Sequence, residues 1–269
     1  MDTTAVLDKD QFQEFFIFCN IIKSDFSDLS IFNGEFRSRP NSKSCIVHIR
    51  FEYMSALTFH ISNIKEFVKG ISFLNNKDCE EVTIVVSDGY VSFHDEYLSS
   101  QFIQANDIFL ENTYIDDQAM TSLIVDNIDT SRIIIQEMLS ESAISRINKV
   151  LKKVKTNEIL IKHAEGDCRK GYMLIEEASS SQNIQHKYTF KNDFIIPMEE
   201  GCSLSIIVLP FRLAGSNNKR EMQVEYYINN AGNRVMCFYK QSILNSTVEI
   251  YSRGAVLNRD GRTRIFWRF

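Results

Sequence analysis

Apolar residues recur at helical intervals near the start of the chain and predict a first helix over residues 8–23. Asp8 and Gln11 stand three residues apart, the spacing of a capping box that satisfies the first free amides of a helix. Asn63 and Glu66 repeat this spacing before a second apolar stripe, which predicts a second helix. The stripes consist of Phe12, Phe15, Phe16, Cys19 and Ile22 in the first helix, and of Ile64, Phe67, Val68 and Ile71 in the second.

Strand patterns surround the second helix. Short apolar or alternating runs predict strands at residues 29–32, 45–53, 57–60, 82–87 and 90–94. Asp88-Gly89 joins the last two runs and predicts a tight hairpin turn, in which both central positions need a positive φ.

The second half of the chain repeats this order. Residues 140–156 show helical periodicity, and a short helical turn is expected around Pro210. Strand patterns cover residues 158–163, 172–177, 188–190, 203–209, 223–229, 234–240 and 247–252. Two similar halves predict an α+β fold of two related domains, each with two helices on one face of antiparallel sheets.

An acidic stretch without a clear period separates the two halves. We therefore expect a first domain over residues 1–112, a connector over residues 113–131 and a second domain over residues 132–257. Residues 258–269 then form a C-terminal tail.

The composition is that of an ordinary globular protein of the cytoplasm. Of the 269 residues, 44% are hydrophobic and 24% are charged, which allows packed cores. No run of 18 apolar residues occurs, and the start is acidic, so neither a membrane nor a secretory route is expected. The six cysteines lack metal-site spacing and are interpreted as reduced, mostly buried thiols.

The net charge of −5 conceals two oppositely charged halves. Residues 1–130 hold nine Lys and Arg against 21 Asp and Glu, a net charge of −12; residues 131–269 hold 21 against 14, a net charge of +7. A cationic surface in the second half suits phosphates, but the asymmetry also fits attraction between halves or between neighbouring subunits.

The helix predicted at residues 140–156 concentrates this positive charge. One side is apolar, and the other carries Arg146, Lys149, Lys152, Lys153 and Lys155. Such a helix is roughly 22 Å long and faces about a dozen phosphates of a DNA duplex. Because its cations would contact phosphates and not base edges, they would bind DNA without reading its sequence. The alternative is a solvated lysine-rich face.

Weaker sets of cations lie at Lys65 and Lys69 on the second helix, and at Arg212, Lys219 and Arg220 around the Pro210 turn. The first helix has no basic face.

The order of these elements resembles the DNA sliding clamps of tailed phages, viral relatives of the proliferating-cell-nuclear-antigen family. Three stretches carry the resemblance: ISNIKEFVKGISFLNNKDCEEVTIVVSDGYVSFHDEYLSSQFIQ, SAISRINKVLKKVKTNEILIKH and CSLSIIVLPFRLAG, the last followed by three strands. The resemblance extends over nearly the whole chain as a pattern of elements, without an invariant motif.

The resemblance implies a ring of three identical chains whose helices line a hole for double-stranded DNA. Such a ring tethers the DNA polymerase, needs a clamp loader and catalyses no reaction. Facing the DNA would be Arg146, Lys149, Lys152 and Lys153, with Lys65, Lys69, Arg212, Lys219 and Arg220 as lesser contributors. Ring closure would pair an edge strand of one first domain with an edge strand of the next chain's second domain. Loaded phage clamps also activate late transcription, which adds RNA polymerase accessory factors as partners and the infected host cell as the location.

The C-terminal tail departs from the family pattern. It ends in an aromatic anchor made of Ile265, Phe266, Trp267 and Phe269, which we expect to bind a partner pocket or a groove of its own ring. An additional edge strand on the second domain is the alternative.

The sequence gives no support to an enzyme. It lacks the spacings GxxxxGK[ST], GxGxxG, HExxH and GxSxG, so we expect no catalytic residue, no metal and no cofactor. The rival functions are a clamp-like viral transcription factor and a structural or assembly protein whose basic helix contacts another subunit.

Overall fold

The structure, a computed structural model, describes most of the chain. The described residues are 2–40, 45–76, 78–104, 114–120, 132–154, 156–176, 184–198, 200–216, 220–229 and 234–257. Lys155, Lys219, most of the expected connector and the whole tail with Ile265, Phe266, Trp267 and Phe269 lie outside them. The chain forms two compact units, Met1–Asp116 with Ser242–Glu249, and Asp117–Gln241 with Ile250–Phe269. The domain limits expected from the sequence stay predictions.

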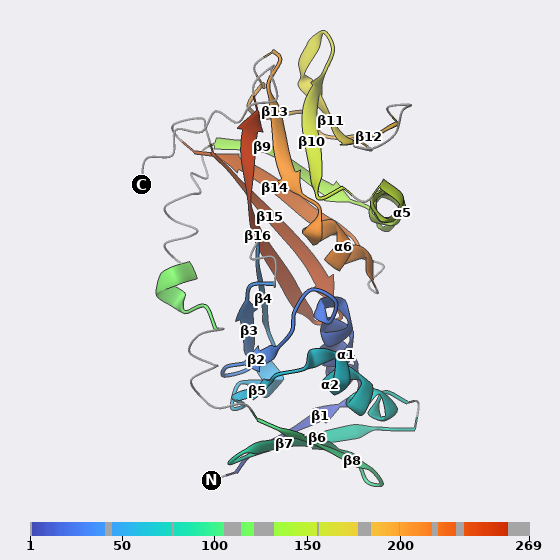
Figure 1. Cartoon of the computed structure of the whole chain (residues 1–269), viewed down its shortest axis with the longest axis vertical. Coiled ribbons are helices and arrows are strands. Elements are labelled where there is room, and N and C mark those ends of the chain that lie inside the picture. The colour runs from blue at the N-terminus through green and yellow to red at the C-terminus, as the bar shows by residue number, and fades with distance from the viewer. Residues whose placement is uncertain are drawn as a thin grey trace. The chain divides into compact units, whose positions relative to one another are not determined.

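Within its described residues, the first unit contains two helices, two short 3-10 turns and three groups of antiparallel strands (Figure 1). Its elements are β1 (Thr3–Asp8), α1 (Lys9–Ile22), β2 (Leu29–Ile31), β3 (Glu35–Ser38), β4 (Cys45–Arg50), η1 (Glu52–Met54), β5 (Phe59–Ile61), α2 (Ile64–Ile71), η2 (Ser72–Leu74), β6 (Glu81–Ser87), β7 (Tyr90–His94) and β8 (Ser99–Ile103). A sheet runs in the order β1-β6-β7-β8, β2 pairs with β5, and β3 pairs with β4.

Local signals set both helices of this unit. The capping box of α1 is confirmed, since the Asp8 side chain accepts from the Gln11 amide at 2.9 Å and the Gln11 side chain accepts from the Asp8 amide at 3.1 Å. Asn63 caps α2 through the Glu66 amide at 3.2 Å. The apolar stripes meet in an aromatic core, where the Phe15 ring contacts those of Phe51, Phe67 and Phe93.

The β6–β7 hairpin forms where the sequence predicts it, but its turn differs from expectation. Gly89 has a φ of 87°, whereas Asp88 does not have a positive φ, so the prediction of two left-handed positions was wrong. The turn that has both is Asn33-Gly34 between β2 and β3, with φ values of 50° and 76°. Glycine alone fits there, because a Cβ on Gly34 would lie 2.6 Å from the Phe51 carbonyl oxygen.

Glu14 on α1 is fully buried and holds the turn between β15 and β16, which belongs to the first unit. Its carboxylate accepts from the amides of Asn245 at 2.8 Å and Ser246 at 3.2 Å, and from the Ser246 hydroxyl. The Tyr53 hydroxyl donates to the same group at 3.2 Å. Burial, with the nearby Glu14 charge, raises the pKa of Tyr53 far above its usual value.

A buried histidine is expected to make the first unit less stable in acid. The His60 ring lies 2.6 Å from the Ser30 hydroxyl, both side chains are buried, and burial lowers the pKa of His60 below 6.5 despite the opposing charge of Asp28. As pH falls, His60 is therefore protonated in the unfolded chain before it is protonated in the folded chain. The stability that the neutral ring contributes is lost as pH falls from about 6.5 toward the lowered folded pKa. We expect the free energy of unfolding to fall more steeply between pH 7 and 5 in the wild type than in His60→Gln, as measured by urea titrations. Equal pH slopes would contradict this.

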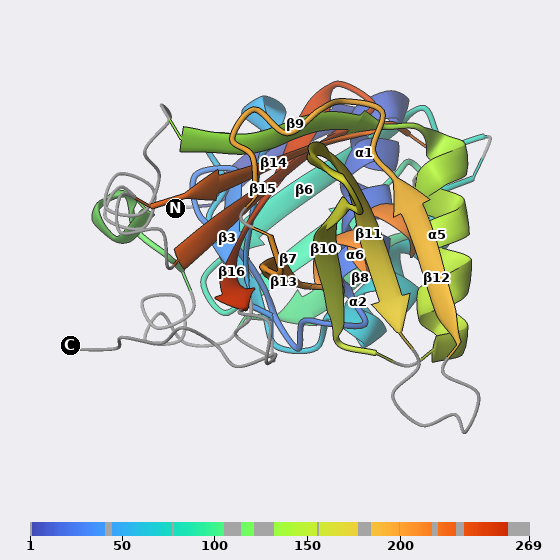
Figure 2. The ribbon, with the colours of Figure 1, turned by 90° about the horizontal axis from the view of Figure 1, so that it is seen from above.

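Among the residues that the structure describes, the second unit contains one long antiparallel sheet, the helices α5 and α6, and a short helical stretch at residues 117–120 (Figure 2). Its elements are β9 (Ile133–Leu139), α5 (Glu141–Val154), β10 (Glu158–Ala164), β11 (Asp167–Glu176), β12 (Gln185–Thr189), β13 (Ser203–Ile207), α6 (Leu209–Ser216), β14 (Met222–Ile228), β15 (Arg234–Ile243) and β16 (Ser246–Leu257). The strands follow the order β12-β11-β10-β13-β16-β15-β14-β9.

The same series occurs in both units: strand, helix, several strands, helix and three strands. This confirms the predicted α+β architecture of two similar halves. The sequence reading missed β1 and β9, the strands that precede the first helix of each unit, as well as β3 and β8. Cysteines are mainly core residues as expected, with Cys19, Cys45, Cys79 and Cys237 buried, Cys202 partly exposed and Cys168 exposed, and none forms a disulfide.

Candidate nucleic-acid interface

Helix α5 presents the cationic surface predicted from the sequence. Its apolar stripe is buried, through Ala143, Ile144, Ile147, Leu151 and Val154. Its opposite side exposes Arg146, Lys149, Lys152 and Lys153. None of these four side chains forms a hydrogen bond or an ion pair with another residue that the structure describes. Four charged groups are thus available to an external anion.

Asn148 fixes α5 against α6. It is buried within the apolar stripe, and its Nδ2 donates to the carbonyl oxygens of Ile144 at 3.1 Å and of Phe211 at 2.6 Å. Asn148 was not among the residues expected from the sequence, although a polar residue inside an apolar stripe is a signal for a buried partner.

Arg212 of α6 lies near the C-terminal end of α5. Its Nη2 donates to the Thr156 carbonyl oxygen at 2.9 Å, so part of its hydrogen-bonding capacity is already used inside the unit. Arg220 is exposed just before β14. Lys152 and Lys153 occupy the last turn of α5, where cations are favoured by the helix dipole.

The helices of the first unit carry much less positive charge. On α2, Lys65 and Lys69 are exposed, with the exposed Glu66 between them. On α1, Lys9 is exposed beside Asp10, and no basic face exists, as the sequence indicates.

Solved structures with the same fold include the proliferating cellular nuclear antigen (PCNA) of Entamoeba histolytica, with a TM-score of 0.60 and 13% identity over 93% of this chain and 98% of that chain. The PCNA2–PCNA3 complex of Sulfolobus tokodaii gives 0.57 and 11% over 94% and 99%. The chain has the DNA clamp fold. DNA polymerase III subunit beta of Borrelia burgdorferi matches at 0.59 and 10%, over 94% of this chain and 64% of that chain. No protein-family model and no curated protein matches the sequence.

In the described part of the first unit, β8 is one of the two edge strands of the sheet β1-β6-β7-β8, the other being β1. Within the described residues, β8 pairs only with β7. The amide of Asp95 donates to the Leu98 carbonyl and that of Gln104 to the Gly89 carbonyl, which fixes the hydrogen-bonding alternation along β8. Ser99, Gln101 and Ile103 therefore direct their amides away from β7. The exposed side chains around this edge include Tyr97, Leu98 and Ile103, the last 85% exposed.

A second open edge lies in the other unit. β12 pairs only with β11 among the residues that the structure places, and the Phe190 amide donates to the Gly171 carbonyl. By the same alternation, the outward amides belong to Gln185, Lys187 and Thr189. The Lys187 ammonium lies 4.9 Å from the centre of the Tyr172 ring and adds positive charge beside this edge.

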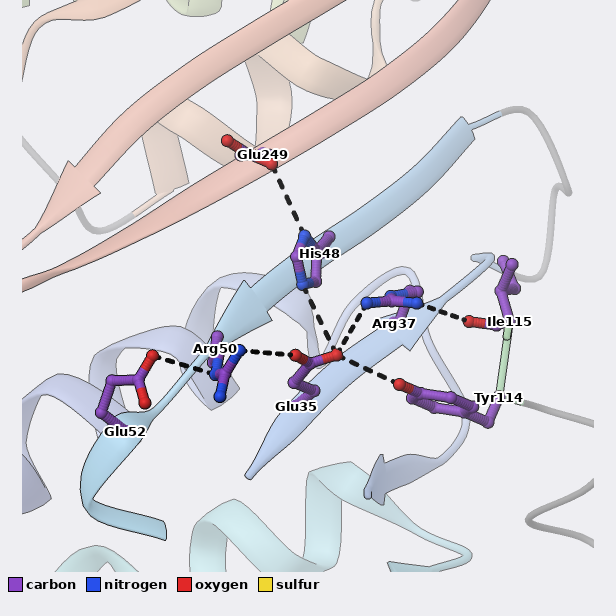
Figure 3. Close-up of polar contacts among 8 residues, drawn as sticks. All are labelled: Glu35, Arg37, His48, Arg50, Glu52, Tyr114, Ile115 and Glu249. Carbon is purple, nitrogen blue, oxygen red and sulfur yellow. Dashed lines mark hydrogen bonds and ion pairs between the residues drawn. The ribbon is translucent and has the colours of Figure 1, made fainter. Parts of the chain in front are cut away.

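A polar cluster on β3 and β4 serves the fold of the first unit (Figure 3). The Glu35 carboxylate accepts from Arg37 at 2.7 Å and from the Tyr114 hydroxyl at 3.1 Å. Arg37 also donates to the Ile115 carbonyl oxygen at 3.4 Å, and the Ile115 amide donates to the Arg37 carbonyl oxygen at 3.0 Å. The cluster thus fixes the chain at Tyr114 and Ile115 against β3.

Neither a metal site nor a membrane helix is found in the part of the chain that is described. No three His, Cys, Asp or Glu side chains there are grouped so that they could hold a metal ion. No helix there is long and apolar enough to cross a membrane.

Proposed function

We propose that this chain is a DNA polymerase sliding clamp, three copies of which close into a ring around double-stranded DNA. The observation that carries the proposal is the row of exposed cations on α5, which have no partner among the described residues, within a DNA clamp fold. Arg146, Lys149 and Lys153 follow each other at spacings of three and four residues, so they form one ridge about 10 Å long. A ridge of flexible cations attracts phosphates without reading bases, which suits a protein that slides.

Ring closure in this proposal pairs β8 of one copy with β12 of the next. Both strands have outward amides without a described partner, and the two edges differ in charge. Asp95 and Glu96 lie in the turn between β7 and β8, whereas Lys187 lies on β12. Opposite charges and complementary edges favour a head-to-tail contact, and in this proposal the ring closes after three copies.

The ring would act by tethering. It would hold the polymerase on DNA, require a clamp loader and perform no bond chemistry itself. An origin in a tailed phage, a location in the infected host cell and a contact with the RNA polymerase machinery in late transcription are part of the same proposal. The aromatic tail is proposed as the partner-binding segment.

The assembly is tested by light scattering. We expect a species of about 94 kDa, three times the 31.2 kDa of one chain, at micromolar concentration. A stable monomer would count against the ring and favour a structural or assembly protein.

The role is tested by polymerase processivity on primed circular DNA with the cognate loader. We expect longer products when the chain is added, and the effect should disappear on linear templates with free ends. A ring that leaves product length unchanged but stimulates transcription would indicate the transcription factor instead.

A further inference from the structure

We propose that the second unit alone grips the DNA, through α5, and that α1 and α2 form a nearly neutral part of the wall. This inference rests on the proposed function and assigns its DNA contact to one unit. It departs from the wider set of contacts expected from the sequence, which included Lys65 and Lys69.

The cations near α1 are not available to phosphates. Lys9 interacts with other groups of the chain and stands next to the exposed Asp10. Lys23 follows the end of the helix, is only partly exposed, and its ammonium donates to the Asn20 side chain at 2.7 Å. The one carboxylate in the middle of α1, Glu14, is buried in its own hydrogen bonds. The exposed side of α1 therefore has almost no net charge with which to attract DNA.

The exposed charges of α2 partly cancel. The helix has eight residues, and Glu66 lies one position after Lys65 and three positions before Lys69. At these spacings the carboxylate is a neighbour of Lys69 on the helix surface and weakens the attraction that the two lysines exert on an anion. A net charge of about +1 remains on this short surface.

Helix α5 differs from α1 and α2 both in its length and in the charge of its exposed side. It has 14 residues, and its single acid, Glu141, lies in the first turn, away from Lys149, Lys152 and Lys153. A buried hydrogen bond from Asn148 to Phe211 holds its position relative to α6, and an exposed one from Arg212 to Thr156 links α6 to the residues just after α5. The charges are therefore carried by a helix that is held in place, and no described residue competes with phosphate for them.

Two matched variants test the proposal, since each helix has a pair of exposed lysines four residues apart. Lys149→Glu/Lys153→Glu on α5 and Lys65→Glu/Lys69→Glu on α2 change the net charge by the same amount. Binding to a fluorescein-labelled linear duplex is measured by anisotropy between 50 and 200 mM salt, a range over which phosphate contacts change affinity strongly. Light scattering and thermal unfolding check that both variants assemble and fold.

We expect the α5 variant to lose affinity by about 100-fold at the lowest salt, and the slope of log K against log salt to fall by at least two, about one for each lysine removed. The α2 variant should stay within about three-fold of the wild type with an unchanged slope. Equal losses, or a larger loss in the α2 variant, would overturn the inference while leaving the clamp function intact. Wild-type protein that does not bind duplex, or two variants that both bind as the wild type does, would refute the DNA contact of the proposed function as well.

Discussion

A Gln101→Pro variant is expected to run as single chains of 31.2 kDa under conditions in which we expect the wild type to form the proposed ring. The Gln101 amide points away from β7, so proline removes no hydrogen bond inside the sheet. At the open edge it removes a donor and places a ring where a strand from the next copy has to approach. Light scattering at micromolar concentration measures the result.

The control is Gln101→Ala, which keeps the amide and should keep the ring. Circular dichroism should show that the proline variant retains the wild-type fold, because proline is tolerated in an edge strand with its nitrogen facing solvent. A proline variant that still assembles to the mass of three chains would exclude β8 as the closing edge.

A Glu14→Ala variant is expected to lower the free energy of unfolding by about 3 kcal/mol, the sum of several hydrogen bonds to a charged group less what water recovers. It leaves the amides of Asn245 and Ser246 without their acceptor. Leu244 in the same turn has a φ of 48°, an unfavourable value for a residue with a side chain, so the turn depends on its external contacts. Chemical denaturation followed by fluorescence measures the loss.

Two further variants separate the contributions at this site. Glu14→Gln keeps the shape of the side chain, but its NH2 group faces amides and hydroxyls that are themselves donors. This variant should therefore lose nearly as much stability as the alanine variant. Tyr53→Phe removes one donor and should cost about 1 kcal/mol. If Glu14→Gln were as stable as the wild type, the charge of the carboxylate would not matter to this turn.

The elements that the sequence predicted well depend on neighbours in the chain. The caps at Asp8 and Asn63 and the stripe of α5 are local, so spacing alone revealed them. β1 and β9 were missed for different reasons. β1 runs directly into the cap of α1. β9 begins with consecutive isoleucines, and its alternation is hidden in the sequence because a buried position holds Glu137 and an exposed one holds Met138.

Long-range partners escaped the sequence analysis at the candidate site and in the core. The cations of α5 could be identified because exposure follows from the helical period. Nothing in the local sequence shows that Asn148 reaches Phe211, or that Arg212 donates to Thr156 and is thus only partly available as a DNA contact. The acceptor role of Glu14 toward residues at the other end of the chain is equally invisible, because such pairs arise only when the fold closes.

The return of Ser242–Glu249 to the first unit affects how the protein is made. Synthesis proceeds from the N-terminus, and α1 with β1 to β8 leaves the ribosome long before Asn245 and Ser246 are translated. Until then the Glu14 carboxylate has no amides from which to accept hydrogen bonds. The N-terminal unit therefore cannot complete its fold before the rest of the chain is made. Nascent chains stalled before residue 242 should therefore hold this unit in an unfinished, protease-sensitive state.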